Sequence, residues 1–168
     1  GRKVGVIGYG WAASAHIAAI NATTRGRVTA VCSSRPLDAE ELSAKHGGPI
    51  KTYQQLDAML ADPTIDVVDI TGLPSLHRDQ AVAAAKAKKH IILEKPMANS
   101  PEEVDEIVAA AAANGVLDNV LSDYLWARAV LLIGPTGATV GLNVQVPMAA
   151  GLDAVWGRPK PAWVKGGG

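Results

Sequence analysis

The feature that most constrains the fold of this 168-residue sequence is a regular alternation of short apolar runs with longer helix-like stretches. The apolar runs predict strands at Lys3–Ile7, Val28–Cys32, Ile50–Tyr53, Val67–Thr71, His90–Glu94 and Val116–Leu121. Helices are expected between them, at Trp11–Thr23, Asp38–His46, Gln54–Ala61, Leu76–Lys89 and Pro101–Asn114. Most runs are continuously apolar, which is typical of strands covered by helices on both faces. We therefore expect an α/β fold with a doubly wound, parallel Rossmann sheet.

Side chains that can cap helices mark several of the expected helix starts. Ser100 precedes a proline and is followed three residues later by Glu103, which forms a capping box. Asp38 offers a second N-cap side chain. Thr52 with Gln55 forms a weaker capping box. These signals place helix starts directly after the expected strands or their connecting loops.

Charge and composition exclude several classes of protein. Sixteen basic residues balance sixteen acidic ones, so the basic face of a nucleic-acid binder is not expected. No stretch reaches the roughly 18 apolar residues of a membrane span, and no signal-peptide pattern opens the chain. Cys32 is the single cysteine, so a disulfide within the chain is impossible. We expect a soluble, cytoplasmic protein that binds neither nucleic acid nor membrane and has no metal site.

The alternating pattern stops after Leu121. Residues 1–122 are expected to form the Rossmann domain. Residues 123–168 contain a helix-like stretch, one β-like segment and a tail rich in proline, glycine and tryptophan. A lone strand cannot bury a face, so this part is expected to begin a second, α+β domain that is truncated at three glycines.

The stretch "VGVIGYGWAAS" places glycines between the first strand and the first helix. Gly8 permits the tight turn, Gly10 lets a pyrophosphate approach the backbone, and Ala13 stands at the third position of the G-x-G-x-x-G/A pattern. Free N–H groups at the helix start favour an anion. The alternative is a structural turn without a ligand. The candidate cofactor-binding residues here are Gly8, Tyr9, Gly10, Trp11 and Ala12.

The end of the second strand bears on which dinucleotide is bound. An acid at this position accepts hydrogen bonds from the ribose hydroxyls of NAD. The sequence has Ser33, Ser34 and Arg35 instead, with no carboxylate to repel a 2′-phosphate. NADP is therefore favoured over NAD. The alternative is that Arg35 is simply solvated and the site accepts both cofactors.

Two further motifs, together with the glycine turn, resemble the Gfo/Idh/MocA family, the glucose–fructose oxidoreductase and inositol dehydrogenase group. The segment Thr71–His77 is close to the family's T-P-x-x-x-H pattern, and Glu94-Lys95-Pro96 follows the fifth strand. His16 also falls where members often have histidine, although a histidine on a helix surface is the commoner explanation. The resemblance covers roughly Lys3 to Gly115 and continues weakly beyond.

The resemblance implies roles for these motifs. Glu94 and Lys95 would reach the nicotinamide ribose, Lys95 would also contact the substrate hydroxyl, and Pro96 would follow a cis bond. A solvated ion pair at a strand end is the alternative for Glu94 and Lys95. The residues expected to form the loop beneath the ribose and diphosphate are Thr71, Gly72, Leu73, Pro74 and His77.

The sequence departs from the family pattern after the Rossmann domain. Leu125 and Trp126 stand where arginine and phenylalanine are expected, and Asp123 or Tyr124 would face the substrate. The sequence ends before the family's Asp-x-x-x-His-type segment, so a general acid/base histidine is not expected in it. A complete second domain would make the protein a homo-oligomer.

The resemblance implies an NAD(P)-dependent oxidoreductase that transfers hydride between the nicotinamide and a sugar, polyol or related secondary alcohol. Lys95 would orient the hydroxyl. One alternative is a non-catalytic NAD(P)-binding sensor or regulator. Another is a truncated Rossmann module without a substrate.

Overall fold

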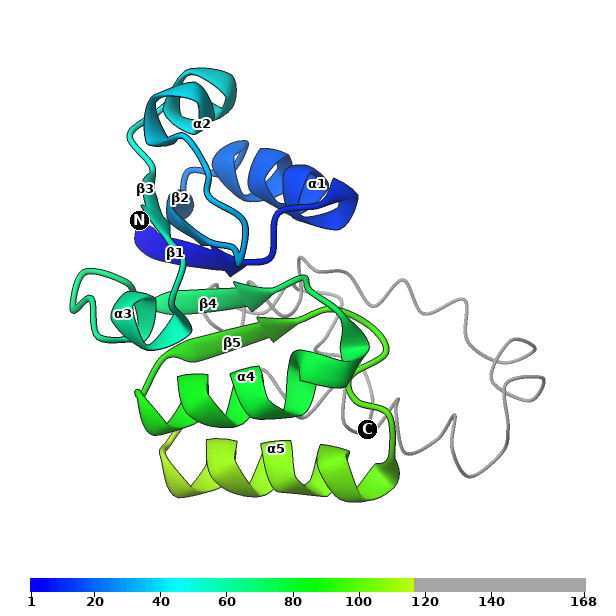
Figure 1. The fold of residues 1–168 in the computed structure, drawn as a ribbon. Helices are drawn as coiled ribbons and strands as arrows, with labels where there is room; N and C mark the ends of the chain where they lie inside the picture. Colours follow the sequence, from blue (N-terminus) through cyan, green and yellow to red (C-terminus); the bar gives the residue numbers. More distant parts are fainter. Residues whose placement is uncertain (117–168) are drawn as a thin grey trace, which may run out of the picture.

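The computed structural model describes residues 1–116, which form a five-stranded parallel sheet in the order β3-β2-β1-β4-β5 (Figure 1). The strands are β1 (Arg2–Ile7), β2 (Gly26–Cys32), β3 (Lys51–Tyr53), β4 (Val67–Ile70) and β5 (His90–Leu93). The helices are α1 (Trp11–Asn21), α2 (Ala39–His46), α3 (Leu56–Leu60), α4 (Pro74–Lys86) and α5 (Pro101–Ala113). The predicted parallel α/β sheet is confirmed. The predicted sixth strand and the predicted domain boundary after residue 122 lie outside the described residues.

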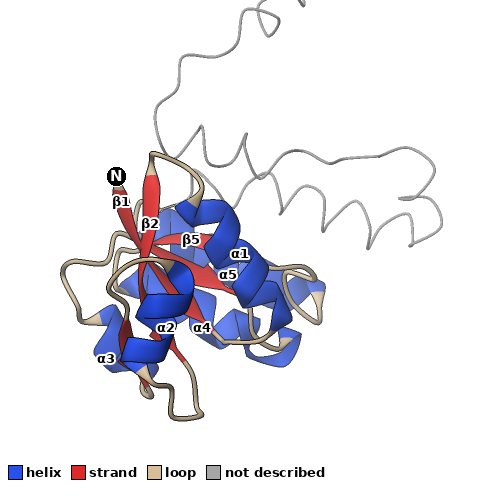
Figure 2. Cartoon of the chain, turned by 90° about the horizontal axis from the view of Figure 1, so that it is seen from above, coloured by secondary structure: helices blue, strands red, loops and turns tan. Residues whose placement is uncertain are grey.

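Helices cover both faces of this sheet (Figures 1 and 2). On one face, Ile17 of α1 and Leu42 of α2 pack with strand residues of β1 and β2. On the other face, Met59 of α3, Ala84 of α4 and Ile107 of α5 pack on β4 and β5. All four residues of β4 are buried, which explains why the strands read as continuous apolar runs. Among the described helices, none is long and apolar enough to cross a bilayer.

Two of the three predicted helix caps are present. The Asp38 carboxylate accepts the N–H groups of Glu40 and Glu41 at 2.8 and 2.9 Å. The Ser100 hydroxyl accepts the N–H of Glu103 at 3.2 Å. The predicted capping box at Thr52 is wrong, because Thr52 lies in β3 and pairs with Val31 of β2. Because this residue takes part in strand pairing at the edge of the sheet, it does not cap the helix that follows.

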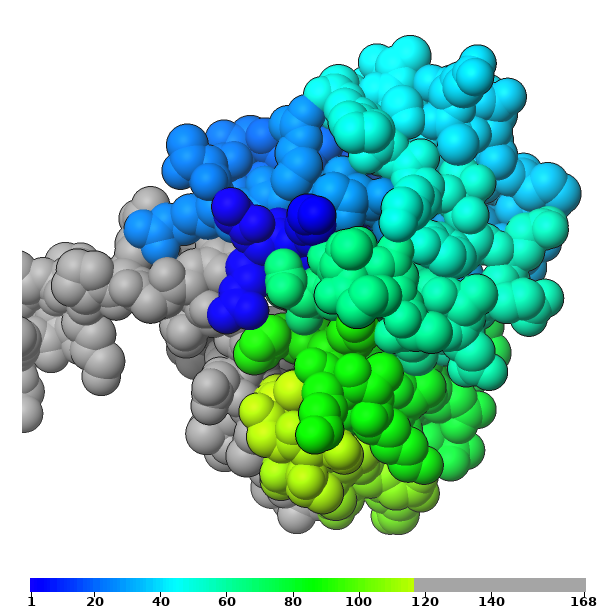
Figure 3. Space-filling model, turned by 90° about the vertical axis from the view of Figure 1, so that its left-hand side faces the viewer, coloured from blue at the N-terminus to red at the C-terminus, as the bar shows by residue number. Residues whose placement is uncertain are grey.

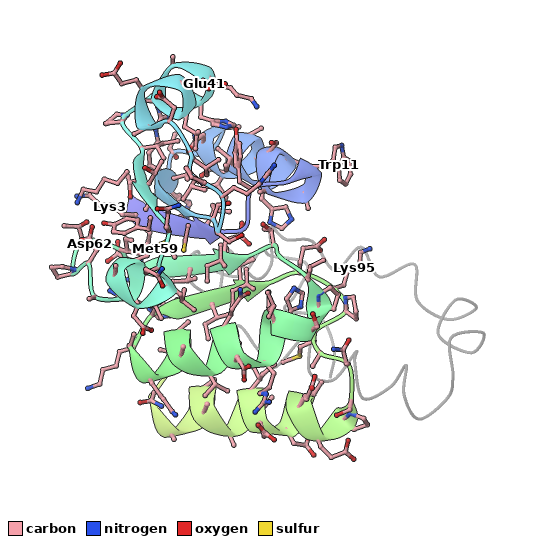
Figure 4. All side chains as sticks on the ribbon, viewed as in Figure 1. Lys3, Trp11, Glu41, Met59, Asp62 and Lys95 are labelled. Carbon is pink, nitrogen blue, oxygen red and sulfur yellow. The ribbon has the colours of Figure 1, made fainter. Side chains whose placement is uncertain are left out.

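The sheet brings the sequence motifs to one edge. β1 pairs with both β2 and β4, so the chain adds strands first on one side of β1 and then on the other. In parallel sheets, ligands bind beyond the carboxyl ends of the strands, at the point where the strand order reverses. Figure 4 shows Trp11 and Lys95 at this carboxyl edge, whereas Lys3 and Asp62 lie toward the opposite edge. The candidate functional residues therefore share one end of the sheet.

The amino edge is held by structural polar contacts. Figure 3 views this side, where the first residues of the chain lie among the other elements. The Asp62 carboxylate accepts hydrogen bonds from Lys51 at 2.9 Å and from the Tyr53 hydroxyl at 2.8 Å. The buried Lys89 ammonium donates to the carbonyl oxygens of Asp62 and Ile65, both at 2.9 Å. These contacts join β3 and the residue before β5 to the loop before β4.

Candidate functional site

The turn after β1 requires glycine at Gly8. Its φ is +91°, a conformation that costs other residues about 1–2 kcal/mol. A Cβ atom at Gly8 would lie 3.2 Å from the Cα of Gly72 and 3.3 Å from Oγ1 of Thr71. The Gly8 N–H donates to the Cys32 carbonyl at 2.8 Å. Gly8 therefore lies where the ends of β1, β2 and β4 meet.

Gly10 is a glycine that the protein itself does not require. It is the N-cap of α1 with φ −122°, and a Cβ atom built there would have no atom of residues 1–116 within 4 Å. Within residues 1–116, the N–H groups of Trp11, Ala12 and Ala13 meet no protein acceptor. The space beside Gly10 is thus open to a ligand that can accept hydrogen bonds from the start of α1.

The side chains that flank Gly10 point in different directions. The Trp11 side chain is 88% exposed at the carboxyl edge. The Tyr9 ring packs on α2, where its hydroxyl accepts from the Lys45 ammonium at 3.1 Å. The same hydroxyl lies 2.9 Å from Nε2 of His46, within hydrogen-bonding distance. Burial and the Lys45 charge lower the pKa of His46, which favours the neutral ring. The Tyr9 side chain therefore connects the turn to α2.

The predicted ribose residues lie beside the glycine turn. Nη2 of Arg35, which is exposed, donates to the Tyr9 carbonyl at 3.0 Å. Ser34 is also exposed. Ser33 is 8% exposed, and its hydroxyl accepts the Arg35 N–H at 3.2 Å. The structure thus joins Arg35 to the turn, whereas the Ser33 hydroxyl shapes the backbone, and a direct contact of Ser33 with the cofactor stays a prediction.

The loop after β4 is tied to the same turn. The Thr71 hydroxyl and N–H both donate to the Ile7 carbonyl, at 2.9 and 3.0 Å. Leu73 is the N-cap of α4 and is 67% exposed. α4 begins at Pro74, earlier than the predicted Leu76, because proline suits the first turn of a helix. Thr71 and Gly72 therefore lie beside Gly8, and Leu73 leads into α4 at Pro74. Their contacts with the cofactor stay predictions.

The His77 side chain lies between this loop and the segment after β5. Its ring is fully buried, with Nδ1 2.9 Å from the Pro96 carbonyl and Nε2 3.0 Å from the Gly72 carbonyl. It bridges the loop after β4 and the segment after β5. Both ring nitrogens face protein oxygens and the ring is buried, so this side chain supports the loop, and a contact of His77 with the cofactor stays a prediction.

The segment Glu94-Lys95-Pro96 leaves β5 at the same edge. The Glu94 N–H donates to the Ile70 carbonyl at 2.9 Å, which extends the β4–β5 pairing by one residue. The Glu94 carboxylate accepts the backbone N–H of Lys95 at 3.1 Å. The Lys95–Pro96 bond is cis, as the resemblance implied. The Lys95 side chain is exposed at the carboxyl edge (Figure 4).

Comparison with known proteins decides the family. A family model described as the oxidoreductase family with an NAD-binding Rossmann fold, GFO_IDH_MocA, matches residues 2–121. The chain belongs to this family. It is 32% identical over 115 residues to the scyllo-inositol 2-dehydrogenase (NADP(+)) IolU of Bacillus subtilis, covering 68% of this chain and 35% of that protein. Inositol 2-dehydrogenase of Salmonella typhimurium is 32% identical over 114 residues, covering 67% of this chain and 34% of that enzyme.

A solved structure agrees with this assignment to the GFO/IDH/MocA family. Myo-inositol dehydrogenase from Lactobacillus casei, in complex with NAD(H) and myo-inositol, superimposes with a TM-score of 0.62 at 31% identity. The match covers 67% of this chain and 33% of that one. The chain thus spans about one third of the length of these relatives.

This GFO/IDH/MocA chain also contains a buried ion pair that the sequence analysis missed. Nδ1 of His16 lies 2.9 Å from Oδ2 and 3.1 Å from Oδ1 of Asp69. The Asp69 side chain is fully buried and that of His16 is 14% exposed, so His16 is not a surface histidine. The hydrogen bond to Asp69 raises the pKa of His16 despite burial. The available signal was Asp69 within an apolar strand, since a buried acid needs a partner.

The remaining predicted residues add little to this site. Asp123 and Tyr124, the candidate substrate residues, lie outside the described residues. Cys32 is a free, buried thiol whose pKa is raised by burial. In the described part of the chain, no cluster of three or more histidine, cysteine or acidic side chains could hold a metal ion.

Proposed function

We propose that this chain is the cofactor-binding part of an NAD(P)-dependent oxidoreductase that prefers NADP. Its reaction would be hydride transfer between the nicotinamide and a sugar, polyol or related secondary alcohol. One observation carries this proposal: the open backbone at Gly10, the guanidinium of Arg35 and the ammonium of Lys95 share the carboxyl edge of the sheet. A dinucleotide lying across the point where the strand order reverses would meet all three.

Each part of the dinucleotide has a proposed position. The diphosphate would contact Gly10 and the N–H groups that follow it, where the start of α1 favours negative charge. The adenosine ribose would lie over β2, next to Ser34 and Arg35. The nicotinamide half would then extend over the ends of β4 and β5. The residues proposed for that half are Thr71, Gly72, Leu73, Pro74, Glu94 and Lys95.

Two side chains at the end of β5 have a proposed part in the reaction. The nicotinamide, when bound, accepts or supplies the hydride. The Lys95 ammonium would orient the substrate hydroxyl and stabilise negative charge on its oxygen as the proton leaves. The Glu94 carboxylate, which accepts the Lys95 N–H, would keep this backbone in place.

The proposal also covers the substrate, the domain boundary and the assembly of the whole protein. The names of the relatives favour an inositol or a similar polyol as substrate. We propose that the cofactor domain comprises residues 1–122 and that residue 123 begins a substrate and oligomerisation domain. We also propose a cytoplasmic homo-oligomer that acts on small molecules; the balanced charge of the sequence provides no basic face for a nucleic acid.

The proposal predicts a selective loss in Arg35→Asp. The dissociation constant for NADP should rise by about 30-fold or more, because a carboxylate replaces the guanidinium beside the 2′-phosphate. The constant for NAD should change by less than about threefold, since a carboxylate can accept from the ribose hydroxyls. Fluorescence titration with both reduced cofactors measures this. Lys86→Asp, the same charge change in the last turn of α4, is the control. Equal losses for both cofactors would remove Arg35 from the ribose site.

The reaction itself is tested by Lys95→Met in the intact protein. Hydride transfer should slow by about 10²- to 10⁴-fold, because the ammonium that orients the hydroxyl is lost. The affinity for NADP should stay within about threefold of the wild type, since a methionine side chain retains the packing of the stem. Absorbance of the reduced cofactor, followed with a panel of inositols and sugars, gives both numbers. Lys86→Met should retain activity, and an active Lys95→Met protein would contradict the role proposed for Lys95.

A further inference from the structure

The His16–Asp69 pair is buried, and its net charge can change by loss or gain of a proton. One proton shared between the imidazole and the carboxyl leaves the pair neutral, whichever group holds the proton. Loss of that proton leaves a net charge of −1, because Asp69 is then an ionised carboxylate beside a neutral ring. The Asp69 carboxylate is fully buried, so water screens this charge poorly.

The pair lies on the side of the sheet proposed for the nicotinamide. Asp69 of β4 pairs with Val6 of β1 on one side and with Ile92 of β5 on the other. Burial is the main cause that raises the pKa of Asp69, and the hydrogen bond to Asp69 is the main cause that raises the pKa of His16; the charge of Glu94, which follows β5, adds to both in the same direction. From α1, β4 and the end of β5, the ionisable groups that influence His16 in the described residues are Asp69 and Glu94. The pair is therefore an electrostatic neighbour of the segment that carries Lys95.

We propose that His16 and Asp69 determine how strongly the site prefers the oxidised over the reduced cofactor. This rests on the dinucleotide site proposed above. The oxidised nicotinamide ring carries a positive charge and the reduced ring carries none, whereas the rest of the cofactor is the same in both forms. A net negative charge on the pair attracts only the oxidised ring, so the ratio of the two affinities follows the charge of the pair.

The expected pH dependence follows from the direction of the shift. The pKa of His16 is raised above its ordinary value of 6.5, since protonation is favoured by the hydrogen bond to Asp69 and by the charges of Asp69 and Glu94. Below this raised pKa the pair is neutral. As the pH rises through it, the pair becomes negative and the oxidised cofactor is favoured. A change of one charge on the pair is expected to change the affinity ratio on the order of fivefold.

The test compares NADP⁺ and NADPH binding between about pH 6 and pH 9. NADPH is titrated by its fluorescence, and NADP⁺ is measured by competition. Asp69→Asn keeps an acceptor for His16 but cannot ionise, so the affinity ratio should not vary with pH above neutrality. The double variant His16→Gln with Asp69→Asn has no titratable group at this position and should give the same flat profile. Circular dichroism verifies that each variant is folded.

His90→Gln is the matched control, because His90 is a histidine at the amino end of β5, away from the cofactor edge. It should keep the wild-type change in ratio. A wild-type ratio that changes by less than about twofold, or a change that persists in both Asp69 variants, would overturn the inference while leaving cofactor binding in place. Failure of the wild type to bind either form would overturn the proposed dinucleotide site, and with it this inference.

Discussion

Gly10→Ala should weaken NADP binding by about 30-fold or more while the protein remains folded. The added methyl group would occupy the space that a diphosphate needs in order to approach the backbone. In the part of the chain that the structure describes, nothing opposes this methyl group, since no atom lies within 4 Å of the Cβ position and φ is −122°. Alanine is a poorer N-cap than glycine, so the free energy of unfolding should fall by less than about 1 kcal/mol. Cofactor titration and chemical denaturation measure the two effects.

Gly8→Ala is the contrasting variant for this experiment. Its Cβ atom would lie 3.2 Å from backbone atoms of Gly72, in a residue with φ +91°. Strain and crowding together should lower the free energy of unfolding by about 2–4 kcal/mol. The two substitutions in this motif are thus expected to have different effects. Gly8→Ala should lower the stability of the fold, and Gly10→Ala should weaken cofactor binding. A Gly10→Ala protein that binds NADP like the wild type would rule out the diphosphate position.

His77→Ala should lower the free energy of unfolding by about 3 kcal/mol. The substitution empties a fully buried position and removes the ring that lies between the Gly72 and Pro96 carbonyls, one of which accepts the N–H of a neutral ring. A lost buried side chain and an unsatisfied buried acceptor each cost about 1–3 kcal/mol. The loop after β4 and the segment after β5 would also separate, so NADP affinity should fall. Urea denaturation and cofactor titration measure both.

His46→Ala is the matched control for His77→Ala, because His46 is a histidine near the surface with one side-chain hydrogen bond. Its ring bonds the Tyr9 hydroxyl and is only partly buried, so the expected loss is less than about 1 kcal/mol. A His77→Ala protein no less stable than His46→Ala would show that the buried ring and its hydrogen bond contribute little to stability. His77 would then not bridge the two segments.

Several parts of the site could be predicted because their physical causes are local. Asp38 and Ser100 cap helices through contacts with N–H groups two or three residues away. Gly8 adopts a positive φ that its missing side chain permits. Thr52 shows where local signals fail, since pairing between β3 and β2 outweighs a weak capping box.

The linear order of apolar runs, glycines and caps was enough to establish a parallel α/β sheet and the edge at which a ligand would lie, because these depend on periodicity and on local backbone geometry. The roles of individual side chains depended on neighbours far away in the chain. His16 and Asp69 are 53 residues apart and meet only after α1 packs on the sheet. His77 connects the loop after β4 to the segment after β5, and Tyr9 connects the glycine turn to α2, for the same reason. Hydrogen-bonding partners are determined by packing between elements, and no local pattern encodes that packing.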